Sequence, residues 1–181
     1  MRTIKKVLVT MVLTLAMVVM SSVAFAAQVV ELNETYNLEQ SRAAVNMYLA
    51  KDTRFYSSMR HAKKPNDYVF AYASTNERNW KLMVYQNGQG YACNVGMIIP
   101  GDEDTEAIAR AGTSLLAAAT GKGYAWGNKA MRPIVSASLG AIKYGKSEFY
   151  CNDTHRYYQL TTKYNDRDNN WYLLVLAFVY E

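Results

Sequence analysis

The side chains of this sequence that could do covalent chemistry are two cysteines and two histidines. Taken in chain order, Cys93, His155 and Asp168 (or Asp166) offer a thiol, an imidazole that could deprotonate it and a carboxylate that could orient the imidazole. This order fits a Cys-His hydrolase. However, Cys93 lies in "YACNVGM", which is typical of a strand, whereas activated thiols usually open a helix whose dipole lowers the thiol pKa.

The two cysteines also support a simpler hypothesis. Cysteines of exported proteins usually pair, so we expect a disulfide between Cys93 and Cys151, worth about 4 kcal/mol in the chain-entropy model. Such a bond would exclude a thiol enzyme. The "DCSGF"-type surroundings seen in exported peptidoglycan peptidases are absent as well. A Cys-His cell-envelope hydrolase is therefore the alternative hypothesis, and whether the chain is an enzyme stays open.

Other catalytic and cofactor motifs are absent from the sequence. There is no G-x-S-x-G nucleophile elbow, and the "GKG" at residues 121–123 lacks the remainder of a P-loop. The spacing of cysteine and histidine does not fit a zinc site, and the acidic cluster at residues 102–106 is more simply a helix start than a calcium loop. We expect no metal and no cofactor.

Aromatic residues are the strongest sign of a binding surface. The chain has 15 tyrosines, all after residue 26, and tyrosine and tryptophan anchor interfaces with little loss of entropy. The glycine-rich loop 122–129 is the best single candidate for a binding site. It brings together Tyr124, Trp126, Asn128 and Lys129, residue types that stack on sugars or fill a partner's pocket. In the alternative, Trp126 fills the core at a corner between helices.

The first 26 residues have the pattern of a cleaved bacterial signal peptide. Arg2, Lys5 and Lys6 precede a short apolar stretch, and the segment ends in small residues with Ala24 and Ala26 in the A-x-A arrangement. We expect a periplasmic or secreted protein of 155 residues, 27–181, forming a single domain. This remainder has 17 basic and 15 acidic residues, which argues against nucleic acid or an anionic membrane as a partner.

Periodicity and turn residues predict one α+β domain, with antiparallel β-meanders packed against two or three helices. Helices are expected at 38–51 after the N-cap Asn37, at 102–120 before the C-cap Gly121, and more weakly at 134–144. Strands are expected at "RFYSSM", "DYVFAYAS", "WKLMVYQ" and "YACNVGMII", and then at "SEFYC", "RYYQLTTKY" and "WYLLVLAFVY". The last strand is apolar on both faces, which predicts a central position.

Two similar stretches indicate an internal repeat. "FYSSMRH" and "FYCNDTH" each place a histidine six residues after a phenylalanine, and N-W-x-L-x-V follows each of them. We interpret this as a tandem duplication of a helix-plus-meander unit, with half-repeats at about 38–99 and 131–181 joined by helix 102–120. His61 and His155 would then share a packing or turn role. A metal site or a catalytic role for them is the less favoured alternative.

A tandem α+β unit with exposed aromatic residues is similar in kind to the β-lactamase inhibitory proteins of bacteria, in architecture alone, since no signature motif matches. The leading hypothesis is a small exported binding protein with an aromatic-rich recognition surface for a protein or a cell-wall saccharide. The alternatives are the hydrolase described above and a structural component of the envelope.

Overall fold

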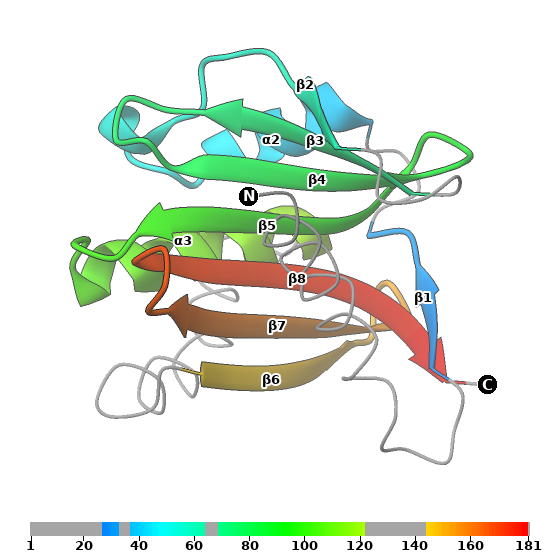
Figure 1. Ribbon diagram of the computed structural model, residues 1–181. Helices are drawn as coiled ribbons and strands as arrows, with labels where there is room; N and C mark the ends of the chain where they lie inside the picture. Colours follow the sequence, from blue (N-terminus) through cyan, green and yellow to red (C-terminus); the bar gives the residue numbers. More distant parts are fainter. Residues whose placement is uncertain (1–26, 33–36, 64–68, 122–143, 181) are drawn as a thin grey trace, which may run out of the picture.

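The computed structural model describes residues 27–32, 37–63, 69–121 and 144–180. In this part of the chain, an eight-stranded sheet carries two α-helices on one face (Figure 1). All strand pairs are antiparallel, so the expected α+β class is confirmed. The elements are β1 (Ala27–Val30), α2 (Leu38–Asn46), the 3₁₀ turn η1 (Lys51–Thr53), β2 (Arg60–Lys63), β3 (Val69–Thr75), β4 (Lys81–Asn87), β5 (Ala92–Pro100), α3 (Thr105–Thr120), β6 (Tyr144–Cys151), β7 (Arg156–Asn165) and β8 (Asn170–Tyr180).

Two β-meanders meet at the centre of the sheet. The strand order is β2-β3-β4-β5-β8-β7-β6, so the last strand of each meander pairs with the last strand of the other. β8 is central, as its two apolar faces predict. β5 pairs with one edge of β8 from Asn170 to Leu176, and β1 pairs with the same edge from Ala177 to Tyr180. β7 pairs with the opposite side of β8.

Helix α2 begins as the sequence predicts and ends earlier. The Asn37 side chain accepts a hydrogen bond from the Gln40 backbone, and the Gln40 side chain accepts one from the Asn37 backbone, which completes a capping box. The helix ends at Asn46 rather than near residue 51, because the Asn46 side chain turns to the following segment. Its Oδ1 accepts from the Phe55 N–H, and its Nδ2 donates to the Phe55 carbonyl.

The same contacts explain why the strand expected at "RFYSSM" is wrong. Arg42 Nη1 also donates to the Phe55 carbonyl, so the backbone at this point is bonded to α2 side chains instead of a neighbouring strand. The Ser57 hydroxyl accepts from the Thr75 N–H, which fixes the next turn against β3. Strand β2 begins only at Arg60.

Helix α3 confirms the predicted C-terminal end but begins at Thr105, three residues later than predicted. The Asp104 side chain caps its first turn by accepting from the Ala107 N–H, and Gly121 ends it in the left-handed conformation with φ of 68°. Its apolar residues at helical spacing are buried (Ile108, Ala111, Leu115, Leu116 and Ala119). The helix expected at 134–144 lies outside the described residues up to Lys143, and β6 begins at Tyr144.

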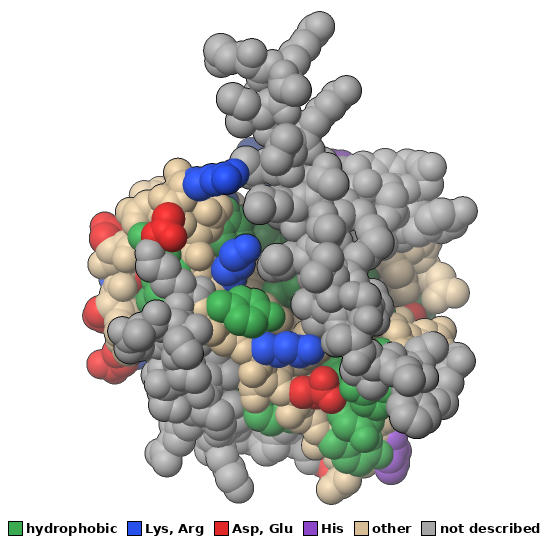
Figure 2. Space-filling view, turned by 60° about the horizontal axis from the view of Figure 1, so that its bottom comes forward, with side chains coloured by type: hydrophobic (Ala, Val, Ile, Leu, Met, Phe, Trp, Pro, Cys, Tyr) green, Lys and Arg blue, Asp and Glu red, His purple; other side chains and the backbone are tan. Residues whose placement is uncertain are grey.

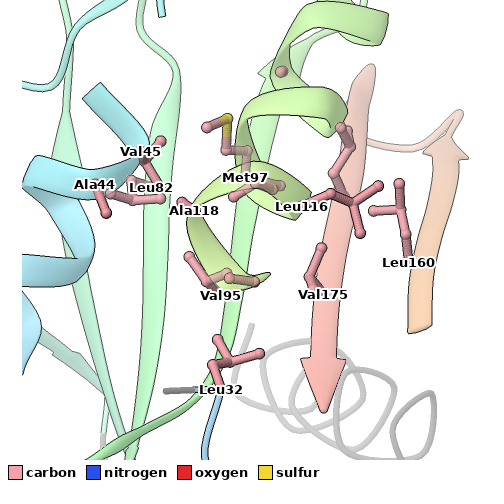
Figure 3. Close-up of a cluster of buried hydrophobic side chains, with 14 of the residues drawn as sticks. Leu32, Ala44, Val45, Leu82, Val95, Met97, Leu116, Ala118, Leu160 and Val175 are labelled. Carbon is pink, nitrogen blue, oxygen red and sulfur yellow. The ribbon is translucent and has the colours of Figure 1, made fainter. Parts of the chain in front are cut away.

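The hydrophobic core lies between the two helices and one face of the sheet. Figure 3 shows Val45 of α2, Leu116 of α3 and Val175 of β8 within one cluster. Alternate residues along each strand point into this layer. They include Leu82, Val84, Val95, Met97, Ile99, Tyr158, Leu160, Leu173 and Ala177. The opposite side of the sheet is called the open face below, because neither described helix covers it.

The two copies of the predicted repeat fall on different kinds of element. His61 lies in the edge strand β2, where its ring meets Tyr72 edge-on at 5.4 Å. His155 lies in the turn between β6 and β7, with a positive φ of 52°. Trp80 precedes β4, whereas Trp171 lies in the central strand β8. A shared role for the histidines therefore has no support in their settings, and the duplication stays a prediction.

Candidate binding site on the open face of the sheet

The best candidate for a binding site in the sequence is loop 122–129. Tyr124, Trp126, Asn128 and Lys129 lie outside the described residues.

The expected disulfide is not present in the structure, and this corrects the sequence analysis. Cys93 and Cys151 are both free and both buried. Cys93 belongs to β5 and Cys151 to β6, and strands β8 and β7 lie between them. Neighbouring strands are about 4.8 Å apart, so three spacings exceed the roughly 7 Å between Cα atoms that a disulfide tolerates.

The thiol of Cys93 is not activated. Burial raises its pKa to about 11, and its Sγ lies 3.1 Å from the Tyr85 carbonyl, to which it donates. Desolvation is the main cause, and the negative charge of Glu31 adds to it because it disfavours the thiolate. A thiol in this state is a weak nucleophile at neutral pH.

The other two members of the hydrolase hypothesis lie far from each other. His155 precedes β7 and Asp168 follows it, and β7 is ten residues long. At about 3.3 Å per residue, these turns are roughly 30 Å apart. Asp168 instead accepts a hydrogen bond from the Tyr172 hydroxyl. Burial and this carboxylate together raise the pKa of Tyr172 to about 12. The structure does not bring Cys93, His155 and Asp168 together as a triad.

A metal site is not found in the described part of the chain, where no three His, Cys, Asp or Glu side chains gather closely enough to hold an ion. None of its helices is long and apolar enough to cross a membrane.

The open face has a regular arrangement of side chains, because residues opposite each other in an antiparallel pair point to the same side. The strand registers define rows that run across five strands. One row, called the amide row here, consists of Tyr85, Asn94, Leu176, Gln159 and Glu148. The row beside it consists of Met83, Gly96, Leu174, Thr161 and Lys146, and the third consists of Lys81, Ile98, Tyr172, Lys163 and Tyr144.

The amide row holds two buried polar atoms that lack a partner. Asn94 Oδ1 and Gln159 Oε1 are both inaccessible to solvent and accept no hydrogen bond within the described structure. They flank Leu176, since Asn94 pairs with it from β5 and Gln159 pairs with it from β7. Gln159 is only 6% exposed. Buried side-chain acceptors are almost always satisfied in folded proteins, so two such atoms in one row identify the most unusual chemistry of this face.

An aromatic cluster lies one row from the amide row, toward the end of the sheet where β1 pairs. It consists of Tyr150, Tyr157, Phe178 and Tyr180. The Tyr157 ring is stacked on Phe178 at 5.6 Å and meets Tyr150 at 4.8 Å and Tyr180 at 4.9 Å. The cluster is partly open, since Tyr150 is 48% exposed. The Tyr180 hydroxyl donates to Glu148 at 3.1 Å, which connects the cluster to the amide row.

Charged groups border these two features. Lys146 and Glu148 are exposed neighbours on β6, and Lys81 is exposed on β4. Figure 2 shows such mixed groups in a space-filling view, with lysine or arginine side chains beside hydrophobic and acidic ones. The arrangement brings aromatic rings, two unpartnered amide oxygens and ionic groups within a few strands of one another.

The sequence predicts an aromatic-rich recognition surface but not the amide row. The relevant pattern in the sequence is "RYYQLTTKY", where Gln159 and Thr161 alternate with Tyr158 and Leu160. In the structure, these four side chains are buried on both faces of β7. A buried polar side chain such as Gln159 on the open face, away from the helices, indicates a candidate binding site. Its pairing with Asn94 depends on the β5–β8–β7 order, which the local sequence does not contain.

Comparisons with known proteins give this chain no relative: no family model, no curated protein and no solved structure matches it.

Proposed function

We propose that this chain is an exported bacterial binding protein whose open face holds a saccharide of the cell wall. The observation that carries the proposal is the pair of unpartnered carbonyl oxygens, Asn94 Oδ1 and Gln159 Oε1. Leaving a buried acceptor unsatisfied costs about 1–3 kcal/mol per group. Two such costs in one row of the sheet are readily explained when a ligand supplies the missing donors.

The surroundings favour a saccharide as that ligand. Sugar hydroxyls are donors of the kind that the Asn94 and Gln159 oxygens lack, and the apolar faces of sugar rings stack on aromatic side chains such as Tyr150 and Tyr180. Binding sites for small ligands commonly combine apolar lining with a few fixed polar groups. A stable protein interface, by contrast, usually has a fully desolvated apolar centre, whereas here two amide side chains flank Leu176 in the middle of the amide row.

Export is the second part of the proposal. It rests on the signal-like segment that ends at Ala26, and it would bring the protein to the compartment where cell-wall saccharides lie. N-terminal sequencing of the protein recovered from periplasmic and culture fractions tests this part. A mature N-terminus at Ala27 is expected, and an uncleaved chain retained in the cytoplasm would overturn it.

The binding experiment uses isothermal titration calorimetry with chitin oligosaccharides and with soluble peptidoglycan fragments. Gln159→Met and Asn94→Leu keep the side-chain size and remove the acceptor, so each should weaken binding at least tenfold, the equivalent of about 1.4 kcal/mol. Gln89→Met, in the exposed turn between β4 and β5, is the matched control and should bind as the wild type does. Unchanged affinity in both open-face variants, or no binding of any saccharide, would refute the proposed site.

A further inference from the structure

The two edges of the sheet differ in how well they are protected. β2 is four residues long, and its pairing with β3 shifts register between His61 and Lys63. Short and irregular edge strands resist pairing with other chains. β6, by contrast, has eight residues in unbroken register with β7 and pairs with no other strand of the described structure. It forms the lower edge of the sheet in Figure 1.

We infer that β6 pairs antiparallel with β6 of a second copy of this chain, with Ser147 on the twofold axis. This register puts Lys146 opposite the partner's Glu148, and Glu148 opposite the partner's Lys146. It also puts Tyr144 opposite the partner's Tyr150. All four of these side chains are exposed and lie on the open face. The segment "YGKSEFYC" is therefore complementary to itself about its serine.

Charge selects this register over its neighbours. An axis on Lys146 would place lysine opposite lysine, and an axis on Glu148 would place glutamate opposite glutamate. Opposite charges that face each other across two strands stabilise the pair, whereas like charges destabilise it. The register centred on Ser147 is the one that forms two opposite-charge pairs and keeps both open faces on the same side.

The resulting dimer would be closed and symmetric. The twofold axis runs perpendicular to the sheet, so each copy contributes the same strand and the contact cannot propagate into a filament. The two open faces join into one continuous surface. The inference rests on β6 alone, and it holds or fails independently of saccharide binding.

The first test is sedimentation equilibrium over a range of protein concentrations. Wild-type protein should associate reversibly into dimers. Lys146→Glu or Glu148→Lys alone should weaken dimerisation by on the order of tenfold or more, because each change creates two like-charge pairs about the axis. The double exchange of Lys146→Glu with Glu148→Lys restores both opposite-charge pairs and should restore dimerisation. A wild type that stays monomeric at every concentration, or a double exchange that does not rescue, would overturn the inference.

The second test checks the register directly. Residues paired across antiparallel strands have Cα atoms about 4.5–5.5 Å apart, which a disulfide can bridge. Ser147→Cys should therefore cross-link to itself under mild oxidation. Lys146→Cys is the matched control, because its own copy in the partner is displaced diagonally by about 7–8 Å. Wild-type protein controls for Cys93 and Cys151. Equal cross-linking of the two variants would exclude this register.

Discussion

At the scale of single residues, two buried acceptors on the open face lower the stability of the fold. Gln159 Oε1 and Asn94 Oδ1 are buried without a partner, and each such acceptor reduces the free energy of unfolding by about 1–3 kcal/mol. Proteins tend to carry this kind of local instability at functional sites. The same two residues therefore make predictions for stability that are separate from those for binding.

Gln159→Met should raise the melting temperature of the ligand-free protein. It replaces an unsatisfied amide by an apolar side chain of similar size, and a gain of about 1 kcal/mol corresponds to roughly 2–4 °C for a chain of this length. Differential scanning calorimetry measures this change, with Gln89→Met as the control that leaves the temperature unchanged. A lower melting temperature would mean that the Gln159 amide already has partners in solution.

Cys93 should make the protein less stable as the pH rises above about 9. Burial raises the folded-state pKa from 9.0 to about 11, so the unfolded chain loses the thiol proton first and gains stability relative to the folded one. The contribution of Cys93 to the free energy of unfolding is fully present below pH 9. It falls by about 1.4 kcal/mol per pH unit up to about pH 11. Urea titrations between pH 8 and pH 11 measure it, and Cys93→Ala should flatten the slope. An equally steep decline in Cys93→Ala would assign the effect to other groups.

At the scale of elements, Gly96 and Gly121 should respond to alanine in different ways. An added Cβ at Gly96 would lie 2.5 Å from the Leu173 carbonyl oxygen of the central strand, whereas at Gly121 it would meet nothing within 4 Å. Gly121→Ala therefore costs only the strain of its positive φ, about 1 kcal/mol. Gly96→Ala should cost more, because backbone in the sheet must move.

Chemical denaturation of the two glycine variants gives this comparison. Gly121→Asn is the matched control, because asparagine tolerates the left-handed conformation better than alanine does. It should be more stable than Gly121→Ala. A Gly96→Ala variant that is as stable as Gly121→Ala would contradict the close approach of β5 to β8.

The elements also show which structure the sequence can predict. The caps at Asn37 and Gly121 were predictable because each depends on residues within four positions of it. The end of α2 and the irregular segment after it were not, because Asn46 and Arg42 bond to Phe55, nine and thirteen residues away. The order of the strands is harder still to predict, because it depends on pairing between segments that are distant in the sequence. The disulfide was mispredicted for that reason, since cysteine number does not reveal the two strands that separate Cys93 from Cys151.

At the scale of the whole molecule, the segment after β1 joins distant parts of the fold. Leu32 is 4% exposed within the core, its N–H donates to the Ala92 carbonyl at 2.9 Å, and its carbonyl lies 3.3 Å from the Tyr158 hydroxyl. Arg156 Nη1 donates to the Glu31 carbonyl at 2.9 Å. A few residues near the start of the described chain thus contact both β5 and β7.

Leu32→Ala should therefore destabilise the whole protein by about 2–5 kcal/mol, the usual cost of truncating a buried leucine. Guanidinium unfolding measures the change, and Met47→Ala, at a side chain that is 73% exposed, is the control with little effect. A loss below about 1 kcal/mol would show that this segment is only loosely attached.

The central position of β8 also determines when the sheet can form during synthesis. Until Asn170–Tyr180 leaves the ribosome, β5 and β7 each lack their shared neighbour, and the two meanders have no strand to join them. The pairings that close the sheet span long stretches of sequence, which slows folding. A newly made chain would thus hold two unjoined meanders until its synthesis is nearly complete, and such an unfolded chain is what the export proposed above would require.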